Sequence, residues 1–385
     1  MTEKAPRQTS GEAGEGTDGF SERTGARRAL VIGALVLTTV VAAGLVLIAP
    51  VPRTLSPAET GDRAVLDAVL PTLEPGPRTR LSIARISPEG QTRFAGRGAD
   101  EHTVFEIGSI TKTFTGALLA IAIERGEVTA ETTLGEVLPE VDSEAGSITL
   151  AQLATHRSGL PRVGHESIAA QASFFLDSLT GRDPYDETNE DLIAIVNRQD
   201  LPDDPEPAYS NLGFAVLGLA LARAAGTDFP ALLQDRILTP LELEDTVLVW
   251  DEDDLPDDPV LGYTDQGDRV EAWTMAASSP AGGIRSSVHD LAIWAAACAD
   301  GSAPGAASIE PIIEYTEGRQ IGMAWITVPP ESAGEQSLVY HNGGTSGFSS
   351  FLGIGEDGSA VVVLGDSQTD VDGAMDVVKG GGDDE

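Results

Sequence analysis

The chain has 385 residues, and its 24 lysines and arginines against 61 aspartates and glutamates give a formal net charge of −37. This acidic balance argues against a nucleic-acid partner, because phosphate backbones are bound by basic surfaces. The single cysteine, Cys298, excludes an intrachain disulfide framework and a thiolate metal cluster. With 41% hydrophobic residues the chain can bury a sizeable core.

The first 49 residues divide into a polar tail and an apolar segment. Residues 1–28 are rich in Gly, Ser, Thr and Glu, which predicts a flexible cytoplasmic tail. Residues 29–49 are uncharged and mostly aliphatic, and as a helix they measure about 32 Å, the thickness of a hydrocarbon core. Three arginines precede this segment and one follows it closely, which predicts a single-pass anchor with everything beyond it extracytoplasmic. A cleaved signal peptide is the alternative, although its apolar core is usually shorter.

The next segments predict the start of a folded domain. Residues 50–61 contain three prolines and are interpreted as a linker. Helical apolar spacing over residues 62–70 ends at Pro71. Residues 80–86 and 91–97 flank a Ser-Pro-Glu-Gly turn and predict a hairpin. We place the domain at residues 62–379 and a disordered acidic tail at 380–385.

The middle of the domain has helical signals and its C-terminal part has strand signals. Helices are predicted over residues 109–125 and 212–224, with further helix starts at Thr149, Thr188 and Ser287. From residue 321 the pattern predicts four short strands, at residues 321–325, 337–341, 348–354 and 360–364. Strands at both ends of the domain around a helical middle predict an α+β fold, with one antiparallel sheet built from both chain ends and flanked by helices.

Ser109 and Lys112 form a Ser-x-x-Lys motif at the start of a predicted helix. A spacing of three places both side chains on one helix face. There a lysine can accept the serine proton or favour the alkoxide, while the helix N-terminus offers a backbone N–H to an oxyanion. Taken alone, the motif also fits an N-capping serine followed by a solvated lysine.

Tyr209-Ser210-Asn211 lies at a predicted junction between a loop and a helix, roughly 100 residues after the serine. The Tyr209 phenol can relay a proton between a nucleophile and a leaving group, and Asn211 can hold a substrate amide or Lys112. A tyrosine that anchors a turn is the alternative.

His341-Asn342-Gly343-Gly344 joins two predicted strands. Glycines there let a substrate carbonyl approach the backbone, and the Gly344 N–H is a candidate second oxyanion donor. A glycine-rich hairpin with a surface histidine is the alternative.

In this order and at these separations, the three motifs resemble the serine β-lactamase and penicillin-binding protein superfamily. Its branch of class C β-lactamases, D-Ala-D-Ala carboxypeptidases and esterases carries S-x-x-K, Y-x-N and K/H-x-G. Three further segments are similar to that branch: residues 153–161 (Leu-x-x-His-x-Ser-Gly-Leu-Pro), 240–243 (Pro-Leu-Glu-Leu) and 280–283 (Pro-Ala-Gly-Gly). The resemblance covers roughly residues 62–376 and implies a β-lactamase/transpeptidase-like fold.

The resemblance implies that Ser109 forms an acyl-enzyme while Lys112 and Tyr209 share the proton transfers, and which of the two is the base stays open. The Ser109 and Gly344 amides would form the oxyanion hole. His341 would replace the usual lysine and help to fix a substrate carboxylate or assist Tyr209.

Two residues of the third motif differ from the residues that bind a substrate carboxylate in β-lactamases and peptidases. Asn342 replaces the hydroxyl residue that binds a substrate carboxylate in β-lactamases and peptidases, and a histidine at position 341 has a less certain charge than a lysine. Both weaken the case for β-lactam or D-Ala-D-Ala specificity.

We therefore expect a membrane-anchored extracytoplasmic serine hydrolase, without cofactor, acting on an amide or ester. The sequence supports two functions almost equally: a D-Ala-D-Ala carboxypeptidase or peptidoglycan-peptide hydrolase, and a carboxylesterase. The alternatives are a β-lactamase and a non-catalytic sensor that binds penicillin or muropeptides. The partners are a small-molecule or peptide substrate and the membrane, and the chain is expected to be a monomer that binds no nucleic acid.

The remaining histidines are assigned no catalytic role. His156 is expected to be a structural hydrogen-bonding residue near the site. His102, His165 and His289 are too scattered in the sequence to predict a zinc site, so no metal is expected.

Overall fold

The computed structural model describes residues 52–164, 176, 181–256, 258–316, 318–331 and 335–380. The chain divides into two units, residues 1–50 and 51–385, and the description below concerns the second. The tail at residues 1–28, the apolar segment at 29–49 and residues 381–385 lie outside the described residues, so their assignments stay predictions. Among the described residues no single helix is long and apolar enough to cross a membrane. One pair of helices, Asn211–Ala225 and Phe229–Leu238, reaches the necessary length and apolar composition only when the two are taken together, and they are bent by 78° relative to each other.

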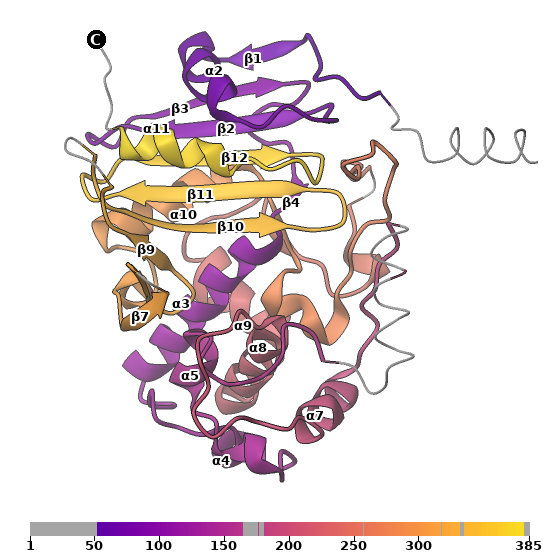
Figure 1. Cartoon of the computed structure of the whole chain (residues 1–385), viewed down its shortest axis with the longest axis vertical. Helices are drawn as coiled ribbons and strands as arrows, with labels where there is room; N and C mark the ends of the chain where they lie inside the picture. The colour runs from indigo at the N-terminus through magenta and orange to yellow at the C-terminus, as the bar shows by residue number, and fades with distance from the viewer. Residues whose placement is uncertain are drawn as a thin grey trace, which may run out of the picture. The chain divides into compact units, whose positions relative to one another are not determined.

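An antiparallel sheet of nine strands joins the two ends of the domain, in the order β1-β3-β2-β12-β11-β10-β9-β8-β7. Figure 1 shows the indigo N-terminal strands beside the yellow C-terminal ones, and the register pairs Ile83 with Val363. This confirms the sheet predicted from both chain ends. The strands are β1 (Glu59–Gly61), β2 (Leu81–Ile86), β3 (Thr92–Arg97), β7 (Ile313–Thr316), β8 (Arg319–Ile321), β9 (Ile326–Val328), β10 (Leu338–Gly344), β11 (Ser349–Gly355) and β12 (Ala360–Gly365).

The central strands bury both faces, because alternate side chains point to opposite sides of a sheet. Leu81 and Ile83 of β2 pack in one core with α2 (Arg63–Val69) and the region of α11 (Met375–Lys379). Ala84 and Ile86 of the same strand pack in the larger core that contains α10 (Val288–Asp300). Coverage on both faces explains why the sequence of β12, Ala-Val-Val-Val-Leu-Gly, is a continuous apolar run.

The helical middle lies to one side of this sheet (Figure 1). The predicted caps at Thr149 and Thr188 form reciprocal capping boxes. Ser287 also caps its helix, but the Asp290 carboxylate accepts hydrogen bonds from Asp245 and Thr246 instead of completing the box. The helices are α3 (Thr111–Glu124), α4 (Leu134–Val137), α5 (Leu150–Ala154), α7 (Asn189–Asn197), α8 (Asn211–Ala225) and α9 (Phe229–Leu233).

A second sheet carries the chain into the helical part. It consists of β4 (Phe105–Glu106), β6 (Ile284–Ser286) and β5 (Val247–Leu248), with β6 in the centre. Its strands are too short for an alternating pattern, which is why the sequence gives no signal for them.

Two sequence predictions differ from the structure. The strand predicted at 321–325 is wrong: β8 ends at Ile321, and the chain turns through Ala324, whose φ is +79°, before β9 begins. Ala324 and Trp325 are apolar because the core buries them in a turn, not in a strand. The predicted linker at 50–61 ends in β1, which pairs with β3, so the sheet begins inside it.

Candidate active site

Ser109 lies in η2 (Gly108–Ile110), a turn of 3₁₀ helix between β4 and α3. Two glycines let β10 approach this turn. A Cβ on Gly343 would lie 2.0 Å from the Ile107 carbonyl oxygen and 3.0 Å from the Ser109 amide nitrogen. Gly108 has a φ of +50°, and a Cβ there would lie 2.8 Å from the Gly344 amide nitrogen. The predicted pair of oxyanion donors therefore belongs to two backbone segments in close contact.

Lys112 is fully buried and its amine has three oxygen partners. Nζ lies 3.1 Å from Ser109 Oγ, 2.8 Å from Asn211 Oδ1 and 2.6 Å from the Ala281 carbonyl oxygen. Burial lowers the pKa of Lys112 well below its ordinary value, and the nearby charge of Arg162 acts in the same direction. The first two motifs of the sequence thus meet at one nitrogen atom.

Tyr209 lies beside this amine at the start of α8, where Ser210 caps the helix by accepting a hydrogen bond from the Gly213 amide. The Lys112 Nζ lies 4.8 Å from the centroid of the Tyr209 ring. Removal from water raises the pKa of the Tyr209 phenol, while its hydrogen bond with Ser109 opposes the rise. The structure therefore brings Ser109, Lys112 and Tyr209 together, as the motifs predict.

His156 holds the tyrosine segment in place. Its Nδ1 accepts a hydrogen bond from the Ser210 amide at 3.2 Å, and its carbonyl accepts one from the Ala208 amide at 2.8 Å. The His156 and Tyr209 ring centroids are 4.4 Å apart. Burial lowers the pKa of His156 well below its ordinary value, with Lys112 acting in the same direction. The expectation of a structural hydrogen-bonding histidine near the site is confirmed.

His341 is buried, not a surface histidine. Its Nδ1 lies 2.6 Å from the Asn342 carbonyl oxygen and must donate, because a carbonyl only accepts. Burial lowers the pKa of His341 to about 3, and the Lys112 charge contributes in the same direction. A neutral imidazole cannot supply the positive charge that a lysine would offer to a substrate carboxylate.

Asn342 is engaged by an acidic side chain. Its Nδ2 donates to Asp372 Oδ2 at 2.6 Å. Burial and the neighbouring Asp370 raise the pKa of Asp372 to about 6, against the opposing effect of the Asn342 hydrogen bond. The Asn342 side chain is thus already engaged by a hydrogen bond within the protein.

A cavity of about 450 Å³ opens onto Ser109 and Tyr209. The motifs supply half of its lining, and the charged residues there were missed by sequence reasoning. Arg162 follows directly on the Leu-Pro of the segment at 153–161, so that segment carried a signal for it. Nothing in the sequence indicated Ser349 of β11, or Gln368, Asp370 and Asp372, which the chain after β12 brings to the cavity.

A buried ion pair lies immediately before the nucleophile. Arg285 of β6 donates to Glu106 of β4 at 2.5 Å, and both side chains are at most 4% exposed. The Glu106 Oε1 also accepts the Trp273 amide hydrogen bond. This pair fixes the strand from which the Ser109 turn departs.

Comparison with known proteins agrees with this geometry. The Beta-lactamase family model matches residues 83–376, more than half of the chain. The chain therefore belongs to the beta-lactamase family of serine hydrolases. The matches to the first curated relatives cover less than half of those proteins' length, at 40%, 44% and 47%.

Two of the curated relatives are named as a peptidase and as a penicillin-binding protein. The chain is 26% identical over 273 residues to the D-alanyl-D-alanine-carboxypeptidase/endopeptidase AmpH of Escherichia coli (strain K12), covering 66% of this chain and 68% of that protein. It is 30% identical over 164 residues to penicillin-binding protein 4 of Amycolatopsis lactamdurans, covering 42% and 40%.

Solved structures confirm the fold. A beta-lactamase/D-alanine carboxypeptidase from Pseudomonas syringae superposes with a TM-score of 0.69 at 20% identity, covering 82% of this chain and 98% of that one. A class C beta-lactamase gives a TM-score of 0.68 at 18% identity, covering 82% and 94%.

Proposed function

We propose that this chain hydrolyses an amide or ester of a peptide-like substrate through an acyl-enzyme on Ser109, with Lys112 as the base. The observation that carries this proposal is the buried Lys112 amine, 3.1 Å from the Ser109 hydroxyl and held by two further oxygen atoms. A solvated lysine or a merely N-capping serine has no need of such an arrangement.

The partners of the amine favour Lys112 over Tyr209 as the base. The Asn211 Oδ1 and the Ala281 carbonyl oxygen can only accept hydrogen bonds. A neutral amine that donates its two N–H bonds to them directs its lone pair at Ser109 Oγ. Burial favours this neutral form by lowering the pKa of Lys112, whereas burial raises the pKa of Tyr209 and disfavours the phenolate.

The reaction follows from these positions. The Ser109 proton moves to Lys112 Nζ as Oγ bonds to the substrate carbonyl carbon, and the Ser109 and Gly344 amides stabilise the resulting oxyanion. The proton then passes, with Tyr209 as relay, to the leaving nitrogen or oxygen as its bond to carbon breaks. Water attacks the acyl-enzyme and restores Ser109, releasing the acid.

One cationic side chain, Arg162, favours a peptide with a free carboxylate over an uncharged ester, whereas Asp370 and Asp372 in the same lining are acidic. His341 is neutral and Asn342 is engaged by Asp372, so neither is suited to a carboxylate. Arg162 lines the cavity and lies 5.1 Å from the centroid of the Tyr209 ring, which makes its guanidinium the carboxylate partner. A D-Ala-D-Ala peptide is therefore the first candidate, and a carboxylesterase substrate is the second.

The test compares a D-Ala-D-Ala peptide with an acyl ester, using the purified chain, Ser109→Ala and Arg162→Met. We expect Ser109→Ala to abolish both reactions, and Arg162→Met to lower kcat/KM for the peptide at least tenfold while leaving the ester unaffected. Ester turnover alone supports the carboxylesterase. Rapid turnover of a fluorescent penicillin supports a β-lactamase, and a folded chain without acylation by any of these refutes the hydrolase.

We also propose that residues 29–49 anchor the protein, with the catalytic domain extracytoplasmic. The length of the apolar segment and the arginines before it support this proposal. We expect the chain to stay with the membrane fraction after an alkaline carbonate wash. An external protease should then release the catalytic domain from spheroplasts, and recovery of the domain in the wash contradicts the anchor.

A further inference from the structure

Two histidines and a carboxylate meet at one end of the small sheet, and none of the three is among the described residues that line the Ser109 cavity. His102 lies three residues before β4, Asp245 two residues before β5, and His289 three residues after β6. Because β6 pairs antiparallel with both β4 and β5, these positions fall at the same end of the sheet.

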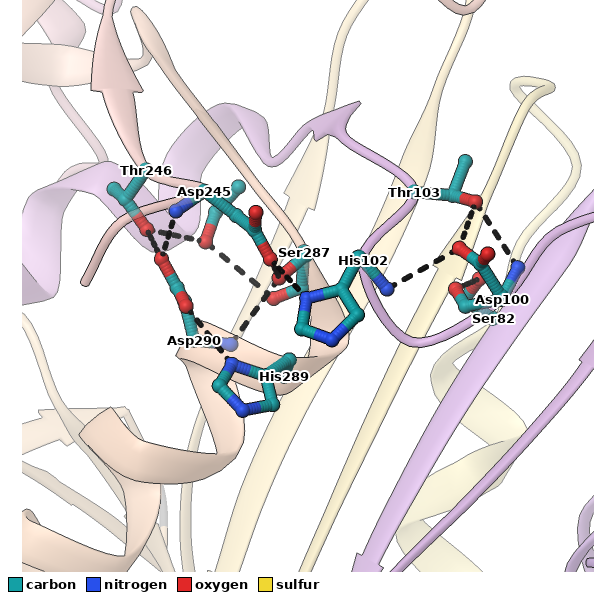
Figure 2. A network of polar contacts seen from close by, with 10 residues as sticks. Ser82, Asp100, His102, Thr103, Asp245, Thr246, Ser287, His289 and Asp290 are labelled. Carbon is teal, nitrogen blue, oxygen red and sulfur yellow. Dashed lines mark hydrogen bonds and ion pairs between the residues drawn. The ribbon is translucent and has the colours of Figure 1, made fainter. Parts of the chain in front are cut away.

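The side chains of this trio are close enough to share an ion. His102 Nδ1 lies 2.8 Å from Asp245 Oδ2, and the ring centroids of His102 and His289 are 4.6 Å apart (Figure 2). One ligand atom from each of the three residues lies within 4.8 Å of the other two. Zinc–ligand bonds of about 2.0–2.2 Å place the donor atoms of a tetrahedral site roughly 3.4 Å apart. The His102–Asp245 pair at 2.8 Å therefore opens slightly and the wider pairs close, an adjustment that the exposed His102 side chain has room to make.

The surrounding network orients the ligands. His289 Nδ1 lies 3.1 Å from Asp290 Oδ1 and donates to it, which leaves Nε2 with a free lone pair. Asp290 is itself held, because its Oδ2 accepts hydrogen bonds from the Asp245 amide and the Thr246 hydroxyl, each at 2.8 Å (Figure 2). Such a carboxylate behind a histidine is the usual support of a metal ligand.

Asp245 is positioned in the same way. Its Oδ2 accepts a hydrogen bond from Ser287 Oγ at 2.8 Å, and Ser287 Oγ in turn accepts one from the Asp290 amide. Two of the three ligands are thus held by Ser287, the N-cap of α10, and by Asp290 in its first turn, and His102 is the most exposed of the three.

We propose that His102, Asp245 and His289 bind one divalent transition-metal ion, of which zinc best matches two imidazoles and a carboxylate. Solvent completes the coordination, since all three side chains are at least 25% exposed. The proton between His102 and Asp245 leaves to solvent as the ion binds. The ion joins the turn before β4 to the starts of β5 and α10, and thereby stabilises the strand that leads to Ser109.

Calorimetric titration of the chelator-treated chain with zinc chloride tests this site. We expect one equivalent to bind, and His102→Asn and His289→Asn each to weaken the affinity at least tenfold. Asp290→Asn should weaken it by a similar factor, because it frees the His289 ring. Asp253→Asn, in the exposed acidic stretch Glu252–Asp254, is the matched control and should bind as the unmodified chain does. Equal affinity in the histidine variants, or no binding, overturns the proposal.

Cobalt gives a second readout that does not depend on how well the variants fold. We expect the cobalt-loaded chain to show the intense visible bands of a four- or five-coordinate ion. An octahedral, water-like spectrum overturns the proposal. Zinc should also raise the melting temperature of the chain and not that of His289→Asn, and an equal rise in both counts against the site.

Discussion

Replacing Lys112 by methionine separates the chemical role of this residue from its structural role. The substitution keeps an unbranched side chain of similar length and removes the amine 3.1 Å from Ser109 Oγ. Loss of a general base lowers rates by about 10²- to 10⁴-fold. This factor corresponds to about 3–5 kcal/mol in the acylation barrier.

The effect on folding should be small because two contributions oppose each other. Methionine leaves the Asn211 Oδ1 and the Ala281 carbonyl oxygen without their donor, at a cost of about 1–3 kcal/mol each. It also removes a fully buried amine, which on folding must either stay charged without water or give up the proton it carries in the unfolded chain, and either costs several kcal/mol. We expect the free energy of unfolding to change by less than about 2 kcal/mol.

The assay is the rate of acylation by a fluorescent penicillin or fluorophosphonate, read by intact mass beside a urea titration. Lys112→Arg is the comparison, because it keeps a positive charge but cannot accept a proton at neutral pH. If Lys112 is the base, both variants lose activity; activity in Lys112→Arg alone would mean electrostatic assistance. Acylation of Lys112→Met within tenfold of the unmodified rate would refute the reasoning.

Three further predictions concern the strand and loop that face Ser109. Gly343→Ala should lower acylation at least about 100-fold and stability by about 1–3 kcal/mol, because its Cβ would meet the Ile107 carbonyl oxygen at 2.0 Å. Gly344→Ala, with its nearest atom at 3.9 Å, should fold as stably as the unmodified chain in the same urea titration, and equal losses in both variants would contradict this account. Burial lowers the pKa of His341 to about 3, so below about pH 6.5 the imidazole takes up a proton in the unfolded chain but not in the folded one. The free energy of unfolding should therefore fall by up to about 1.4 kcal/mol per pH unit as the pH drops. In urea titrations at pH 7 and 5, His341→Asn should make this fall smaller. The pKa of Asp372, raised to about 6, makes stability depend on pH in the opposite direction, because the carboxyl ionises more readily in the unfolded chain as the pH rises from about 4 through 6. Asp372→Asn should therefore have a higher melting temperature than the unmodified chain at pH 7.5 and the same melting temperature at pH 4. A difference that does not change with pH would exclude this cause.

Local sequence signals determined much of the fold and the order of the motifs. Helix starts at Thr149 and Thr188 follow from capping patterns that act within three residues, and they are confirmed. The strand predicted at 321–325 was wrong because apolar residues there fill the core from a turn, and apolar character alone does not distinguish a buried turn from a buried strand. The strand β1 and the small sheet gave no signal, since two or three residues are held by their neighbours more than by their own pattern.

The sequence by itself determined the pairing of Ser109 with Lys112, because a helical spacing of three fixes the two side chains on one face whatever surrounds them. Only the tertiary structure decided the surroundings of that pair. The burial of the amine and its contacts with Asn211 and the Ala281 carbonyl oxygen come from distant segments, and our proposal of Lys112 as the base depends on them. The tertiary structure also decided the burial that lowers the pKa of His341, and it decided how close His102 lies to His289. His102 and His289 are far apart in the sequence, but the antiparallel pairing of β4 with β6 brings their rings to 4.6 Å, whereas His165 lies outside the described residues. Short-range geometry is encoded in spacing, but burial and long-range contact depend on how the whole chain packs.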